Sequence, residues 1–264
     1  MPPDFMSRLT CFKQLTRLEL PMCHLTDGDL DGLSEFTNLR ILDLRGSPVS
    51  DRGFAQLDKL SHLQILVLSE TRAGDQVLRQ ASRLPNLNSL VLSQTVVSDE
   101  GLKDVGTFPK LKVLFLDGTP ISDISLESLP PLPSLIHLSF NGCAITDRGL
   151  ATLDDHRFPA LQHLDASGTQ VTAEGVSRLR LGHLQGLHFP KVAMTDEHWR
   201  ELARMKSLNY VMWGELHLRR EEVFYAKRPR VRLDSFIDLP GVQLGLQPRR
   251  VIQRFPKSSV PESR

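Results

Sequence analysis

The sequence lacks the features that would place it in several large classes of protein. Its 264 residues carry a formal net charge of +1 with 24% charged residues, so no global charge attracts nucleic acid or a membrane surface. No stretch approaches the ~18 consecutive apolar residues of a membrane span. Residues 1–5 lack the charged and apolar regions of a secretory signal. These absences predict a cytoplasmic protein that binds neither nucleic acid nor membrane.

Motifs of common catalytic chemistry are also missing. The sequence has no GxxxxGK(S/T) phosphate loop, GxGxxG dinucleotide motif, HExxH zinc motif, GxSxG nucleophile elbow or CxxC pair. One nucleophile-like pair, Cys23 beside His24, lies at a turn where successive side chains point in different directions. The chain is therefore predicted to be no enzyme and to need no cofactor.

What the sequence does contain is a repeat. Nine segments open with a leucine that is followed by apolar residues at the fourth and sixth places. The openers recur every 24 residues, apart from one unit of 26 and one of 23; they are Leu15, Leu39, Leu63, Leu87, Leu111, Leu135, Leu161, Leu184 and Leu208. A unit this short cannot bury its own apolar face, so the units must stack on one another as a solenoid.

Each unit changes its periodicity halfway along. The fourth and sixth places alternate as on one face of a strand, whereas in the fourth unit Leu102, Val105 and Phe108 recur every three residues as on a helix face. Ser98 followed by Asp99 is typical of a helix start, because a hydroxyl can cap free amides and a carboxylate is favoured at the positive end of the helix dipole. Each unit therefore predicts one strand and one short helix.

The pattern L-x-x-L-x-L-x-x-(T/S/C), followed by (V/I)-(S/T)-D-x-G-L, resembles the leucine-rich repeat family, with Thr, Ser or Cys replacing the usual Asn. Its second half resembles ribonuclease-inhibitor-like and cysteine-containing repeats, which include substrate-binding halves of F-box proteins. It resembles bacterial repeats of planctomycete type even more closely. The resemblance covers roughly residues 3–234 and implies a right-handed α/β solenoid, or horseshoe. About ten parallel strands would line its concave face and short helices its convex face.

Cysteine is scarce, and two of the three cysteines occupy equivalent places in their units. Cys23 and Cys143 stand at the ninth place, which in this family packs inside the turn and hydrogen-bonds the backbone. Five units, or ~24 Å at ~4.8 Å per strand, separate them and exclude a disulfide. Both are expected to be buried structural thiols.

The two ends depart from the repeat. Residues 1–14 keep the helical half of a unit and are expected to form an N-terminal cap or to continue a longer parent chain. Residues 15–234 are expected to form the repeat domain, ending in a capping strand over 231–233. Residues 235–264 are predicted to be an irregular basic tail, docked or disordered. The basic run 227–232 could be a nuclear-targeting or nucleic-acid patch, but we favour a solvated capping strand because its footprint is small.

Places 3 and 5 of each unit should project from the concave face, because places 4 and 6 point into the core. In units 2 to 5 these places are apolar, and we call them the apolar patch: Ile41, Ile65, Val67, Val91, Val113 and Phe115. An exposed patch of this size, flanked by Arg17, Glu19, Asp43 and Arg45, predicts a docking site for a protein. Alternatively, β-branched residues merely suit strands, or another part of the chain covers them.

A second group, the histidine zone, follows in units 6 to 8 and consists of His137, His163, Asp165 and His188. Imidazoles and a carboxylate are zinc ligands. The same side chains could instead form a polar, pH-sensitive partner contact or have no specific role. We expect no metal here, and we include the zone with Asp43 and the apolar patch in the candidate partner-binding surface.

These features together predict a monomeric, non-enzymatic protein-binding module that acts as an adaptor or recognition surface. One alternative is the substrate-recognition part of a larger regulatory or ubiquitin-ligase-type assembly, whose F-box would lie N-terminal in a parent chain. A second alternative is a purely structural spacer, which would need no exposed patch.

Overall fold

The computed structural model describes residues 8–103 and 108–219. The chain divides into two units, Met1–Arg232 and Leu233–Arg264, and every described residue belongs to the first. The predicted capping strand at 231–233, the basic run 227–232 and the tail lie outside the described residues.

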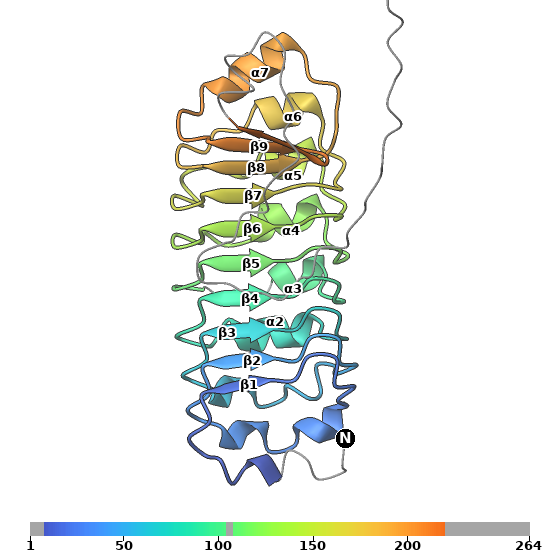
Figure 1. The fold of residues 1–264 in the computed structure, drawn as a ribbon, viewed down its shortest axis with the longest axis vertical. Helices are drawn as coiled ribbons and strands as arrows, with labels where there is room; N and C mark the ends of the chain where they lie inside the picture. The colour runs from blue at the N-terminus through green and yellow to red at the C-terminus, as the bar shows by residue number, and fades with distance from the viewer. Residues whose placement is uncertain (1–7, 104–107, 220–264) are drawn as a thin grey trace, which may run out of the picture. The chain divides into compact units, whose positions relative to one another are not determined.

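One parallel strand from each of the nine units joins a single sheet in chain order (Figure 1). The strands are β1 (Arg17–Glu19), β2 (Ile41–Asp43), β3 (Ile65–Val67), β4 (Ser89–Val91), β5 (Val113–Phe115), β6 (His137–Ser139), β7 (His163–Asp165), β8 (Gly186–Phe189) and β9 (Tyr210–Trp213). Each starts at place 3 of its unit, and equivalent places lie side by side, as Ile41 does with Ile65. The predicted strand of each unit and its register are confirmed.

A tenth strand, β10 (Leu216–Arg219), was not predicted from the sequence and runs antiparallel to β9. Only Gly214 and Glu215 separate the two strands, and a connection of two residues can join antiparallel strands but not parallel ones. Gly214 adopts φ 62°, a left-handed conformation that glycine reaches without steric cost. A hairpin therefore follows the ninth unit, and the tenth strand that the sequence predicted, at 231–233, lies outside the described residues.

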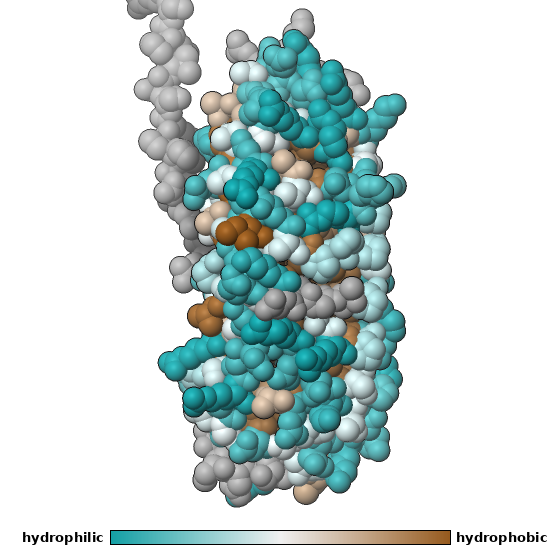
Figure 2. Space-filling model, turned by 180° about the vertical axis from the view of Figure 1, so that it is seen from behind, coloured by the Kyte–Doolittle hydropathy of each residue, from teal (hydrophilic) through white to brown (hydrophobic). Residues whose placement is uncertain are grey.

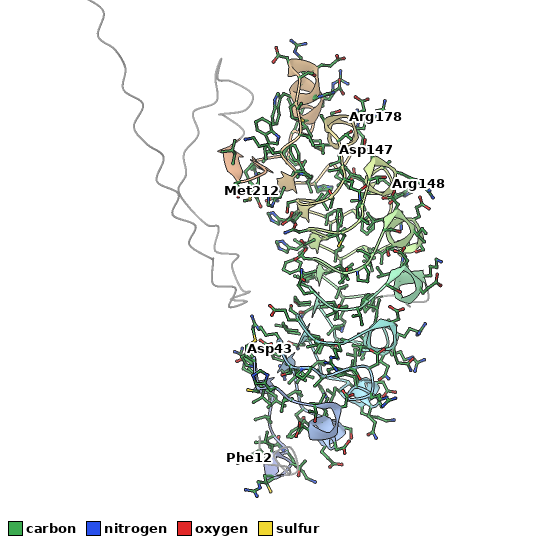
Figure 3. All side chains as sticks on the ribbon, turned by 90° about the vertical axis from the view of Figure 1, so that its right-hand side faces the viewer. Phe12, Asp43, Asp147, Arg148, Arg178 and Met212 are labelled. Carbon is green, nitrogen blue, oxygen red and sulfur yellow. The ribbon has the colours of Figure 1, made fainter. Side chains whose placement is uncertain are left out.

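Short helices follow the strands on the other side of the solenoid. They are the 3₁₀ helices η1 (Asp27–Leu30), η2 (Leu33–Glu35) and η3 (Leu57–Lys59) and the α-helices α2 (Asp75–Ala81), α3 (Asp99–Lys103), α4 (Asp123–Ser128), α5 (Asp147–Leu150), α6 (Ala173–Ser177) and α7 (Asp196–Ala203). Asp43 and Met212 lie on the strand side, whereas Arg148 and Arg178 lie on the helix side (Figure 3). The predicted helix start is confirmed, since Ser122 and Thr146 accept hydrogen bonds from the amides of Ile124 and Arg148.

A continuous apolar core lies between the sheet and the helices. Places 1, 4 and 6 supply its strand side, and in the fifth unit Leu111, Leu114 and Leu116 are fully buried. At the N-terminal end Leu15 and Leu20 pack against the core but are only partly buried. Each unit thus relies on its neighbours on both sides for burial, as expected of stacked repeats.

Threonine hydroxyl groups at the ninth place hold the turn after the strand in four of the units. Their Oγ1 atoms donate to the carbonyl at place 6 over 2.5–2.7 Å in four units, namely Thr71, Thr95, Thr119 and Thr169. Cys143 is buried, as predicted, and its Sγ donates to the carbonyl of Leu116 at 3.1 Å. Cys23 is only half-buried, which corrects the prediction, because it belongs to the first unit of the stack.

Carboxylates tie the helix starts of consecutive units together as far as α6, and we call these contacts the aspartate clamps. The side chain of Asp123 accepts from the amide of Thr146 at 2.8 Å and from its hydroxyl at 2.6 Å. The same pair of bonds joins Asp27 to Ser50, Asp75 to Ser98, Asp99 to Ser122, and Asp147 to Thr172. The aspartate of the (S/T)-D motif therefore does more than favour its own helix dipole.

The clamps also explain the glycine of the D-x-G motif. A Cβ atom on Gly101 would lie 2.3 Å from Oδ1 of Asp75, and one on Gly175 would lie 2.0 Å from Oδ1 of Asp147. Glycine at this place leaves room for the carboxylate of the preceding unit. One short motif thus encodes a helix start, a clamp and the space for the previous clamp.

Candidate functional site

The apolar patch is assembled in the predicted register but is less exposed than expected. Ile41, Ile65 and Phe115 are half-buried. The three valines are only 3–7% exposed and form the floor between them: Val67, Val91 and Val113. The expectation of a solvent-facing surface is wrong for these valines. In an in-register ladder each side chain has neighbours ~4.8 Å away on both sides, which cover its flanks.

The charged flank of the patch is largely paired within itself. Asp43 is buried, and both of its carboxylate oxygens accept from Nε of Arg45, at 3.1 and 2.9 Å, with a closer contact from Nη2. The hydrogen bonds that Arg45 donates to Asp43 raise the pKa of Arg45, although burial opposes this. Arg17 donates to Glu19 at 3.3 Å, and this pair is exposed. These hydrogen bonds thus fix Asp43 and Arg45 to one another beside the apolar patch.

The histidine zone contains a row of rings that continues beyond the predicted residues. The rings of His137 and His163 stack with centroids 4.5 Å apart and planes 7° apart. Nδ1 of His163 lies 3.0 Å from the hydroxyl oxygen of Tyr210, whose ring centroid is 6.0 Å from that of the imidazole. We call His137, His163 and Tyr210 the ring row. It projects from β6, β7 and β9 on the concave face.

Gly186 makes this row possible. It holds the place-3 position on β8, between His163 and Tyr210. A Cβ atom at Gly186 would lie 2.1 Å from Cζ of Tyr210, so the tyrosine ring passes over the glycine to reach His163. Tyr210 was not among the predicted site residues. A glycine next to a tyrosine in the place-3 ladder was the signal that could have found it.

His188 and Asp165 form a separate pair. Nδ1 of His188 lies 3.1 Å from Oδ2 of Asp165, and Nε2 lies 3.0 Å from the carbonyl oxygen of Gly214. The other carboxylate oxygen of Asp165 accepts from the amide and hydroxyl of Ser167. Burial disfavours the imidazolium, but the hydrogen bond and charge of Asp165 outweigh it and raise the pKa of His188.

The ring row has the opposite protonation preference. Burial, together with the neighbouring charge of His163, lowers the pKa of His137 to about 4. Burial also lowers the pKa of His163. At neutral pH the row is therefore uncharged, and it presents flat rings with a few polar atoms.

The structure separates the histidine zone into the ring row and the His188–Asp165 pair rather than joining it around one point. Within residues 8–103 and 108–219, no group of three or more His, Cys, Asp or Glu side chains is arranged to hold a metal ion. Both nitrogens of His188 already face oxygen acceptors of the protein. A zinc site therefore finds no support in the described geometry, and the absence of bound metal stays a prediction.

Asp117, at place 7 of the fifth unit, is a polar residue that was not predicted from the sequence. Its Oδ1 accepts from the amide of Asn141 at 2.9 Å and, more closely, from the hydroxyl of Ser139; Oδ2 accepts from the hydroxyl of Ser93 at 3.2 Å. Burial, reinforced by the charge of Asp165, raises the pKa of Asp117 despite these bonds. Only residues at places 3 and 5 were named for the binding surface, so this half-buried acid, which bridges three units, was overlooked.

The repeat register and the single sheet identify the architecture, and comparisons with known proteins agree. A family model described as a leucine-rich repeat matches residues 132–153. The solved structure of internalin C2 from Listeria monocytogenes str. 4b F2365 superposes with a TM-score of 0.58 at 22% identity, over 78% of this chain and 84% of the internalin. The chain has the leucine-rich repeat fold.

A second structural neighbour with this fold is the internalin inlF from the same Listeria strain, with a TM-score of 0.50 at 19% identity over 80% of this chain and 68% of that one. At these identities the likeness concerns the fold. A search of curated proteins found no matching relative. Among the described residues, no helix is long and apolar enough to cross a membrane.

Proposed function

We propose that this protein is a non-enzymatic protein-binding module that recognises its partner on the concave face. The observation that supports this best is the ring row. His137, His163 and Tyr210 are half-buried, project away from the core and stack on three separate strands. Flat rings held in one place by a rigid scaffold give large contact area at low entropic cost, which is typical of interface hot spots.

The surroundings of the ring row have the composition of an interface. Three half-buried apolar side chains extend the ring row toward the N-terminal units as an apolar strip: Phe115, Ile65 and Ile41. The His188–Asp165 pair and Asp117 supply polar groups whose hydrogen bonds are already formed. An apolar centre beside preorganised polar groups binds a partner with little reorganisation.

The helix side offers a different surface. Figure 2 shows it covered mainly by hydrophilic side chains, with isolated hydrophobic ones. Scattered single hydrophobic residues are normal on protein surfaces and do not indicate a binding site. This contrast favours the concave face as the recognition surface.

Recognition on the concave face would serve both of the more specific roles, the adaptor and the substrate-recognition part of a larger assembly. An adaptor in the cytoplasm needs only a rigid face that binds one protein, and a substrate-recognition part of a larger assembly would use the face in the same way. A structural spacer would leave the ring row and the room that Gly186 provides for it without a purpose. We therefore favour recognition over a spacer.

The proposal is tested by affinity capture from the native lysate, followed by quantitative mass spectrometry. Wild type is compared with Phe115→Asp, which places an unpaired charge in the strip, and with Tyr210→Ala, which removes the end of the ring row. Val96→Asp is the matched control, because Val96 is exposed and lies in the connection between β4 and α3. Circular dichroism and thermal melts establish that each variant is folded.

Proteins captured by wild type and by Val96→Asp should be lost by both concave-face variants. Retention of the same proteins by folded Phe115→Asp and Tyr210→Ala would contradict recognition on the concave face. Loss with Val96→Asp alone would instead assign binding to the connection between strands and helices. A Phe115→Asp variant that does not fold leaves the decision to Tyr210→Ala.

A further inference from the structure

The N-terminal edge of the sheet presents backbone groups outward. β1 pairs with β2 on one side, and no other described strand adjoins it. The carbonyl of Thr16 accepts from Ile41, and the amide of Leu20 donates to Asp43, so the peptide groups of these alternate residues face β2. Successive residues of a strand direct their peptide groups to opposite edges, so those of Arg17 and Glu19 face away from the sheet.

We propose that this edge pairs with the same edge of a second copy of the chain. The two β1 strands would run antiparallel, related by a twofold axis at Leu18. Arg17 of each copy would then lie opposite Glu19 of the other, so that both charged pairs are complementary. These side chains are 61% and 45% exposed and project from the same face of the strand.

Only this register satisfies both the charges and the backbone. With Leu18 at the centre, Arg17 and Glu19 of opposite copies exchange amide and carbonyl bonds, which gives four hydrogen bonds. A centre at Arg17 or at Glu19 would place identical charges opposite one another. With Glu19 at the centre, Arg17 would also face Pro21, which has no amide hydrogen to donate. The three-residue strand is therefore complementary to itself in one arrangement.

Apolar side chains gather at the same end. Phe12, one of the four large hydrophobic residues that are strongly exposed in the described part of the chain, precedes β1 in the sequence. Phe12 lies at the N-terminal end of the described stack (Figure 3). Leu15 and Leu20 leave the end of the core partly uncovered. Association at this edge would bury apolar surface in addition to the backbone bonds.

Self-complementarity favours a second copy over an unrelated partner. Exposed edge strands commonly carry charges of one sign, which repel a second copy, or end in proline. Here one positive and one negative charge alternate, and Pro21 limits the edge to a short strand. The dimer would join the sheets of the two copies, and with them their concave faces, into one continuous sheet. It would replace the monomer expected from the sequence.

Sedimentation velocity over a concentration series tests the proposal. Arg17→Glu leaves two acidic side chains on β1, and Glu19→Arg leaves two basic ones, so each variant would pair like with like. Each variant turns both cross-strand charge pairs of the dimer from attractive to repulsive, which should weaken self-association at least about twofold. Lys112→Glu is the control, since it reverses an exposed charge immediately before β5.

The decisive experiment mixes the two variants in equal amounts. The acidic and basic β1 strands complement each other in the proposed register, so the mixture should form a heterodimer although neither variant forms a homodimer. A wild-type protein that stays monomeric at about 100 µM overturns the proposal, because the interface would then be too weak to matter. Dimers that persist in both single variants, or a mixture that fails to associate, overturn it equally.

Discussion

At the scale of single residues, two histidines on the concave face have pKa values that are shifted in opposite directions, because only one of them has a carboxylate neighbour. His137 stacks on another imidazole and has no carboxylate partner among its described contacts, so burial dominates and its pKa falls to about 4. His188 is also partly buried, but Asp165 and a backbone carbonyl face its two nitrogens, and its pKa rises. The charge of the concave face therefore depends on pH in two opposing ways.

His137 should make the protein less stable in mild acid. The unfolded chain takes up a proton on this imidazole near pH 6.5, whereas the folded protein does so only near pH 4. Its contribution to stability is therefore present above about pH 6.5 and is lost as the pH falls toward 4. Thermal melts from pH 7.5 to 4.5 should show a smaller acid-induced drop for His137→Gln than for wild type. Parallel curves would contradict the buried, neutral histidine.

His188 should act with the opposite sign and is the matched comparison. Because its folded pKa is raised, its contribution is fully present below the unfolded value of 6.5 and is lost as the pH rises through the folded value. His188→Gln should therefore lose more melting temperature at pH 5.5 than at pH 8, relative to wild type. An equal loss at both pH values would mean that the ion pair with Asp165 does not stabilise the fold.

At the scale of elements, each strand and turn inside the stack is fixed by both neighbours, so a cavity there cannot close by local collapse. Leu116 is fully buried, and its carbonyl accepts from the hydroxyl of Thr119 and the thiol of Cys143. Leu116→Ala should therefore lower the free energy of unfolding by roughly 2–5 kcal/mol. Chemical denaturation measures this, with Val96→Ala at an exposed position as the control. An unchanged midpoint would contradict the inward placement of place 6.

The aspartate clamp should appear as a coupling between two residues of adjacent units. Gly101→Ala places a methyl group against the carboxylate of Asp75 and should destabilise the protein, and Asp75→Ala should do so by removing two hydrogen bonds. In the double variant the close carboxylate atoms are gone. The combined loss should fall short of the sum by roughly 0.5–3 kcal/mol in a double-mutant cycle. Additive losses would show that the glycine is not there to make room.

At the scale of the whole molecule, periodicity made the architecture predictable. The nine leucine openers determined the strands and their register, because a 24-residue unit can bury its apolar places only by stacking in register. The antiparallel β10 escaped the prediction because it lies past the last opener, where no repeat constrains the chain. Gly214 stands at the turn, but glycine is equally common in loops, bulges and helix ends, so this residue alone does not predict a hairpin.

The candidate site was predictable as a surface but not in detail. The choice of places 3 and 5 follows from strand alternation, and it placed His137 and His163 correctly beside each other. Burial of Val91 depends on what its ladder neighbours cover, and the role of Tyr210 depends on reaching across Gly186. Both depend on contacts between units, which a pattern within one unit does not encode.

The C-terminal tail should contribute little to the stability of the repeats. Its sequence lacks the apolar spacing of the repeat and is rich in Pro and charged residues. A chain truncated after Leu233 should melt within about 2 °C of the full chain, since a change of 1 kcal/mol shifts the melting temperature by ~2–4 °C at this size. A large drop, or loss of soluble protein, would instead identify the tail as a cap.

The row of aspartate clamps ends before the solenoid does. Its last member joins Asp147 to Thr172, and Ala173 then stands where the next clamping carboxylate would be. Between α6 and α7 the side chains form an ion pair, Arg180 with Glu201 at 3.3 Å, and Nε2 of His198 lies 3.4 Å from Oε2 of Glu174. Such pairs are screened by salt, whereas a capped amide is not. The amide hydrogens of the final repeat should therefore be the first to exchange faster as ionic strength rises. Ala173 marks the position in the chain beyond which the repeats separate first.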